Sequence, residues 1–203
     1  MLATLAQFKS RFGIAGTADD TALTALLLRT SALLARRAGR TCGGSVCLEK
    51  TALTQYFSPQ AGARILRLAA YPVVSITTVK EDLFEDWTGA TAMTVKEDYL
   101  LDSEGGVLSR LLVPWLDSRA GRTVQVVYTG GYTAAGSSPG SGETALPEDL
   151  ADAAMQQAMH FWQRRGRLGS SGESVGGASV STETGDDLLP VVKDVCAALR
   201  RPL

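Results

Sequence analysis

The feature that most constrains the fold is a change of hydrophobic periodicity along the chain. Residues 18–40 and 147–167 carry apolar side chains at helical spacing, whereas residues 46–132 are rich in strand-forming residues and short turns. A period near 3.6 indicates a helix, and alternation indicates a strand. The sequence therefore predicts an α+β fold, in which two long helices and several short ones form a small helical bundle with an inserted antiparallel β block.

Charges and prolines support the expected helices. A short helix is expected over residues 4–12. The first long helix begins at Asp19–Asp20 and ends at Arg36–Arg37, which is the charge order that the helix dipole favours. Pro147 lies in the first turn of the second long helix, where its missing N–H costs nothing. A short terminal helix is expected over residues 188–199.

The β block divides into short runs of strand-forming residues separated by turn residues. Residues 46–57 and 64–68 are expected to pair as strands, and residues 73–79 form a further strand. Residues 99–110 have the pattern of a hairpin that turns at two glycines. Residues 123–128 alternate, which places three side chains on one face of a strand: Val124, Val126 and Tyr128.

Two segments are poor in side chains that can pack. Residues 134–144 form a Gly/Ser/Pro linker. Residues 168–187 are mostly Gly, Ser, Thr and acidic residues, which bury too little apolar surface to stay ordered alone. The expected organisation is residues 1–45 as N-terminal helices, 46–132 as the inserted β block, 133–167 as linker and second long helix, and 168–203 as a flexible C-terminal arm with a short terminal helix.

The net charge limits how the protein can contact DNA, and the cysteines indicate in which cellular compartment it is located. The formal net charge of −1 provides no strongly basic surface, so any contact with DNA must be local. The cysteines Cys42, Cys47 and Cys196 are odd in number and follow no secretion signal, which favours reduced thiols in a cytosolic setting. The most apolar stretch, residues 23–34, is interrupted by Arg29 and is too short to span a membrane.

The residue sets that usually carry catalysis are missing from the sequence. His160 is the single histidine and is expected to be an ordinary helix residue, and there is no Gly-x-Ser-x-Gly or Walker-type motif. Cys42, Cys47 and the distant His160 make a poor zinc set. We therefore expect no enzyme, metal or cofactor. An enzyme or a small-molecule-binding domain stays open as an alternative, with a pocket lined by Asp98, Asp102 or His160.

Two arginine clusters allow two interpretations. The first cluster is Arg36, Arg37 and Arg40, and the second is Arg164, Arg165 and Arg167. The favoured interpretation is that they compensate helix dipoles at solvated helix ends. The sharper hypothesis is that both clusters lie at one end of a helical pair and present a positive patch to DNA or to an acidic partner.

Three stretches occur in an order that points to a known family. The first is Leu5–Ile14, followed by Asp19–Asp20 and a leucine-rich helix with a basic end. The second is Tyr71–Val79. The third is Val124–Tyr132, which is followed by a linker and by Leu146–Leu150 opening a helix that ends in arginine. This order, over residues 4–167, resembles the head–tail connector proteins (adaptor or head-completion proteins) of long-tailed bacteriophages.

The resemblance implies a structural role at the head–tail interface of a virion, reached through the host cytoplasm during assembly. Subunits of this family form a homo-oligomeric ring, typically twelvefold, which binds the portal protein, extends the channel for double-stranded DNA and docks the next neck or tail-completion protein. A C-terminal arm commonly reaches toward the portal. Here the arm is residues 168–203, and its expected docking residues are Leu188, Leu189, Val191, Val192, Val195 and Leu199.

Two features leave room for another virion role. The β block looks larger than in compact members of the family, and the low-complexity segment is long. A tail-completion or stopper protein is therefore the alternative function within the virion. Neither role involves a membrane.

Overall fold

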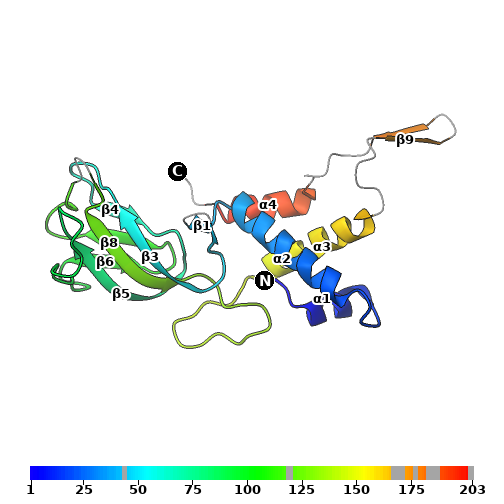
Figure 1. The fold of residues 1–203 in the computed structure, drawn as a ribbon, viewed down its shortest axis with the longest axis horizontal. Coiled ribbons are helices and arrows are strands. Elements are labelled where there is room, and N and C mark those ends of the chain that lie inside the picture. Colours follow the sequence, from blue (N-terminus) through cyan, green and yellow to red (C-terminus); the bar gives the residue numbers. More distant parts are fainter. Residues whose placement is uncertain (43–44, 118–120, 166–171, 176–177, 182–187, 201–203) are drawn as a thin grey trace. The chain divides into compact units, whose positions relative to one another are not determined.

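The computed structural model describes residues 1–42, 45–117, 121–165, 172–175, 178–181 and 188–200, and it divides the chain into two compact units (Figure 1). The helical unit contains residues 1–39 and 146–203, and the β unit contains residues 40–145. All four described helices lie in the helical unit and both three-stranded sheets lie in the β unit, so the α+β class that the sequence predicts is confirmed.

The helical unit contains the four helices that the sequence predicts. They are α1 (Leu5–Phe12), α2 (Asp20–Arg37), α3 (Glu148–Gln163) and α4 (Pro190–Ala198). Local signals set the ends of α1. Thr4 caps its N-terminus through a reciprocal pair of hydrogen bonds with Gln7, and Gly13 ends it with a left-handed φ of 64°.

The core of the helical unit is built mainly from α2 and α3. Leu23 and Leu27 of α2 are buried beside Phe8 of α1 and Ala158 of α3. The two leucines lie in the first half of α2 and the alanine in the second half of α3, so α2 and α3 run in opposite directions, as Figure 1 shows. Small alanine side chains on α3 let the helix backbones approach each other closely, because they occupy little space between the helices.

The β unit contains two three-stranded antiparallel sheets. The first has the order β3 (Thr51–Phe57), β8 (Val124–Gly130), β5 (Val73–Glu81). The second has the order β4 (Ile65–Arg67), β7 (Val107–Arg110), β6 (Tyr99–Asp102). A two-residue pair, β1 (Thr41–Cys42) with β2 (Ser45–Val46), precedes them. The hairpin predicted over residues 99–110 is confirmed as β6 and β7.

One predicted strand pairing is wrong. Residues 64–68 were expected to pair with residues 46–57, but β4 pairs with β7, and β3 pairs with β8 along its full length. β8 pairs with β3 on one side and with β5 on the other, so β3 is held by β8 and β4 belongs to a different sheet. Val124, Val126 and Tyr128 of β8 are all fully buried, as their alternation predicts.

Glycine is required where β8 ends. Gly131 has a φ of +106°, and a Cβ atom added there would lie 2.5 Å from the carbonyl oxygen of Glu49. Both the conformation and the close approach of the backbone exclude a larger residue. The chain can therefore leave the sheet at this point and turn toward the segment that precedes α3.

The prediction of three reduced thiols is wrong for two of the cysteines. Cys42 and Cys47 form a disulfide, and Cys196 is a free, buried thiol. Cys42 is the last residue of β1 and Cys47 directly follows β2, so the pairing of these strands brings their Cα atoms to 5.8 Å from each other. The count of cysteines alone could not show this proximity.

The segment expected to lack order contains a further hairpin. Strands β9 (Gly172–Val175) and β10 (Ala178–Ser181) pair antiparallel, although the composition of residues 168–187 favours no strand. The other residues in that range lie outside the described residues. Separately, none of the described helices has the length and hydropathy needed to cross a membrane.

Candidate assembly surfaces

Helix α4, the expected docking element of the C-terminal arm, packs against α2 and α3 of its own chain. Leu188 and Val192 are buried, and the thiol of Cys196 lies 3.8 Å from the carbonyl oxygen of Leu34. The backbone N–H of Leu189 donates a 2.9 Å hydrogen bond to the side-chain oxygen of Gln157, which is itself fully buried. The apolar face of α4 is therefore largely used within the subunit.

The six predicted docking residues thus fall into three groups. Leu188 and Val192 are buried in the helical unit, and the side chain of Val191 is 55% exposed. The remaining three are half-buried: Leu189, Val195 and Leu199. Val191 is therefore the exposed large apolar side chain among these six residues, and the docking role of all six stays a prediction.

In the first arginine cluster, the prediction of a solvated side chain is wrong for Arg40. Its side chain is only 2% exposed, and its guanidinium carbon lies 3.0 Å from the centre of the Tyr71 ring. Its Nη1 atom also donates a 2.8 Å hydrogen bond to the carbonyl oxygen of Tyr71. The cation therefore stabilises the start of the β unit and does not face DNA.

Replacing Arg40 by Met should lower the free energy of unfolding by about 2 kcal/mol, because the change removes both the cation–π contact and a charge-assisted hydrogen bond. Urea denaturation followed by circular dichroism measures this loss. The control is Arg36→Met, since Arg36 is exposed at the end of α2. Equal stability of the two variants would contradict the buried role of Arg40.

The structure does not bring the two arginine clusters together at one helix end. Arg36 and Arg37 are exposed in the last turn of α2, and Arg164 and Arg165 follow the last turn of α3, which runs the opposite way. The guanidinium of Arg165 stacks on Trp162, 3.6 Å from the ring centre. Arg167 lies outside the described residues. Any positive surface is therefore divided between two ends.

The residues considered for a pocket or metal site have structural roles. Asp98 accepts a 2.8 Å hydrogen bond from the Thr94 N–H, and Asp102 accepts one from the Gly105 N–H. His160 is half-buried on α3, with its ring beside that of Phe161. No group of three potential metal ligands comes together among the described residues. These contacts are those of turns and of helix packing.

The linker contains one anchor that sequence reasoning missed. Glu143 forms a 2.6 Å salt bridge with Lys50 and accepts hydrogen bonds from the Thr133 hydroxyl and the Gly140 N–H. The hydrogen bond from the Lys50 side chain is the main reason that the pKa of Glu143 lies below its ordinary value. The end of the linker is thereby fixed to the β unit, although the composition of residues 134–144 indicated few side chains to pack.

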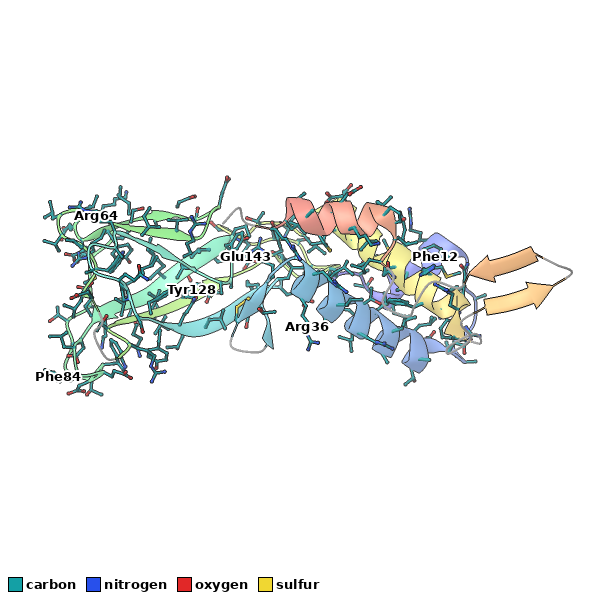
Figure 2. All side chains as sticks on the ribbon, turned by 90° about the horizontal axis from the view of Figure 1, so that it is seen from above. Phe12, Arg36, Arg64, Phe84, Tyr128 and Glu143 are labelled. Carbon is teal, nitrogen blue, oxygen red and sulfur yellow. A yellow bond between two sulfur atoms is a disulfide. The ribbon has the colours of Figure 1, made fainter. Side chains whose placement is uncertain are left out.

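Two exposed apolar loops of the β unit were also missed. Phe84 is 88% exposed and Leu112 is 81% exposed, the largest values among the large hydrophobic side chains that are described. The signal in the sequence was the pair Leu83–Phe84, which has two acidic residues on each side, and the pair Leu112–Val113, which is followed directly by Pro114. Figure 2 shows Phe84 at one edge of the β unit.

Comparisons with known proteins give matches only at the level of structure. No protein-family model and no curated protein matches the sequence. A chain in the virion of a native gene transfer agent particle aligns over 98% of this chain and 90% of its own length, with a TM-score of 0.62 and 20% identity.

Chains in two neck structures agree with this match. One belongs to the neck of an empty gene transfer agent particle computed with C6 symmetry; it covers 98% of this chain and 90% of its own, with a TM-score of 0.57 and 21% identity. The other belongs to the neck of a native gene transfer agent particle computed with C12 symmetry. It covers 90% of this chain and 84% of its own length, with a TM-score of 0.56 and 19% identity. This chain therefore has the fold of chains found in phage-like necks and virions, as its resemblance to head–tail connector proteins predicts.

Proposed function

We propose that the protein is a structural, non-enzymatic subunit of a phage neck ring, which binds the portal protein, extends the DNA channel and joins the head to the tail. The observation that carries this proposal is the match to a chain of a gene transfer agent neck over 98% of this chain. A match of that extent covers the helical unit and the β unit together. It is consistent with the whole chain being one neck component.

The symmetry of the related particles supports a ring. One neck was computed with C12 symmetry and the other with C6 symmetry, and a ring of twelve identical subunits satisfies both. We therefore propose a twelvefold homo-oligomer located in the virion. In this ring residues 1–39 and 146–203, which include α4 of the C-terminal arm, supply the helical part, and residues 40–145 supply the β insertion.

The exposed part of α4 is the proposed contact with the portal protein. Val191 supplies an exposed apolar side chain, while Leu188 and Val192 hold the helix on its own subunit. An apolar side chain on a helix that is already fixed loses little conformational entropy when it binds. For the DNA channel, the exposed Arg36 and Arg37 are the candidates for non-specific phosphate contacts.

Portal binding by α4 can be tested with a pair of matched variants. Val191→Asp should weaken binding to the portal protein roughly tenfold or more, because it places a carboxylate in an apolar contact. Leu28→Asp is the control, since Leu28 is 54% exposed on α2 and Val191 is 55% exposed on α4. Co-sedimentation of each variant with portal measures the difference. Equal binding of the two variants would remove α4 from the portal contact.

A further inference from the structure

The β unit presents two exposed apolar loops that we name by their most exposed residues. The Phe84 loop is residues 82–89, with Leu83 59% exposed and Phe84 88% exposed. The Leu112 loop is residues 111–114, with Leu112 81% exposed and Val113 53% exposed. A single exposed apolar residue on a surface needs no explanation, but adjacent pairs at two sites mark candidate contact surfaces.

The Phe84 loop is held in one conformation by hydrogen bonds. The carboxylate of Asp82 accepts a 2.6 Å hydrogen bond from the Phe84 N–H and a 3.1 Å one from the Asp86 N–H. Glu85 has a φ of 59° and accepts hydrogen bonds from the backbone N–H and the guanidinium of Arg122. The exposed aromatic ring is therefore presented by an ordered loop, which lowers the entropy lost on binding.

The Leu112 loop is fixed at both ends to the start of β4. The Trp115 N–H donates a 2.8 Å hydrogen bond to the Ala63 carbonyl, and the Trp115 indole donates one of 2.9 Å to the Arg64 carbonyl. At the other end, Nη1 of Arg64 donates to the Leu111 carbonyl. Arg64 is itself exposed, so this apolar loop has a cation beside it.

The two loops carry opposite charges and lie apart. Asp86 of the Phe84 loop is exposed, and hydrogen bonds from Thr88 hold the pKa of its carboxyl below the ordinary value, so it is ionised near neutral pH. Arg64 is the cation beside the Leu112 loop. Figure 2 shows Arg64 and Phe84 at opposite edges of the β unit. A contact between two copies of the chain can bring the acidic loop of one to the basic side of the other.

We propose that the Phe84 loop of one subunit docks on the Leu112 loop of the next subunit, with Asp86 facing Arg64 of that neighbour. The occupant of each surface is a second copy of this chain. A contact between two different surfaces of identical subunits is head-to-tail, and repeated head-to-tail contacts generate a ring when the rotation closes. The inference rests on the proposed neck ring and names the surfaces that build it.

Covalent trapping of full-length protein tests this contact. Leu83→Cys and Val113→Cys leave the anchors Phe84 and Leu112 in place and lie at exposed positions of the same loops. They are made in separate chains that carry tags of different size, and the two are mixed with a short bismaleimide. Cys196 is buried and Cys42 is paired with Cys47, so the introduced thiols are the accessible ones among the described residues. The mixture should give a heterodimer at a yield roughly thirtyfold above random encounter, the enrichment expected from one interface anchor side chain.

The control replaces Val113→Cys by Leu28→Cys, at another exposed apolar position. A heterodimer yield from Leu83→Cys with Val113→Cys that is no higher than the control yield would overturn the inference. So would an equal yield of Leu83→Cys homodimer, because that outcome indicates a symmetric contact. Failure of the proposed function is recognised separately: wild-type protein would then form no ring on the portal, whatever the trapping result.

Discussion

Val192→Asp should release α4 from the helical unit and expose Cys196. Val192 is fully buried, and an unpaired carboxylate at such a position costs about 3–5 kcal/mol. Cys196 lies one turn further along the same helix and is a buried thiol, and burial raises its pKa as well as shielding it. Its reaction with an aromatic disulfide reagent should therefore accelerate roughly a hundredfold or more in the variant, since 1.4 kcal/mol corresponds to a factor of ten.

The neighbouring residue provides the control for this experiment. Val191→Asp introduces the same charge at an exposed position of the same helix, so Cys196 should stay protected. Equal thiol reactivity in Val192→Asp and the wild type would contradict the packing of α4. The same reagent also tests the disulfide: unfolded wild-type protein should show one reactive thiol without reductant and three after reduction.

Trp115→Ala should destabilise the β unit by about 3–5 kcal/mol, the usual loss for removing a buried Trp side chain. Trp115 is 1% exposed and belongs to the core cluster that also contains Tyr128 and Leu108. Its indole N–H additionally satisfies the Arg64 carbonyl. The free energy of unfolding in guanidinium chloride, followed by the near-ultraviolet signal of the β unit, measures the effect.

Trp115→Phe is the matched variant for this prediction. It retains an aromatic ring but loses the hydrogen bond to the Arg64 carbonyl, so we expect a smaller loss of about 1–3 kcal/mol. Because Trp115 fixes one end of the Leu112 loop, Trp115→Ala should also reduce the trapped heterodimer described above. A loss below 1 kcal/mol for Trp115→Ala would contradict its place in the core.

The helices and the central β strand could be predicted because their signals are local. Thr4 and Gly13 mark the ends of α1 directly, and the alternation of Val124, Val126 and Tyr128 identifies a face that is fully buried. The sequence resemblance also indicated the fold that the gene transfer agent chains share. The capping residues and the alternation lie within a few residues of the structure that they predict, whereas the resemblance rests on the order of motifs along the chain.

Features that depend on distant partners could not be predicted. The burial of Arg40 depends on Tyr71, 31 residues away, and an arginine after a helix end looks the same in sequence whether it is solvated or buried. The pairing of β4 with β7 could likewise not be predicted, because several strands of the β unit have similar patterns of apolar residues. The packing of α4 on its own chain depends on Gln157, 32 residues earlier.

The proposed interaction surfaces illustrate the same limit. Leu83–Phe84 and Leu112–Val113 are apolar pairs in the sequence, and such pairs more often contribute to a core. Only the hydrogen bonds of Asp82 and Trp115 show that both loops are ordered while their apolar side chains face solvent. Exposure is a property of the fold and not of the local sequence.

Electron microscopy of the purified protein mixed with the portal protein of the same particle tests the central claim most directly. The account predicts a closed twelvefold ring bound to one face of the portal, with the central channel continued through it. Portal particles that carry no added ring, together with assembly of the protein on tail tubes, would contradict the claim and would favour a tail-completion role.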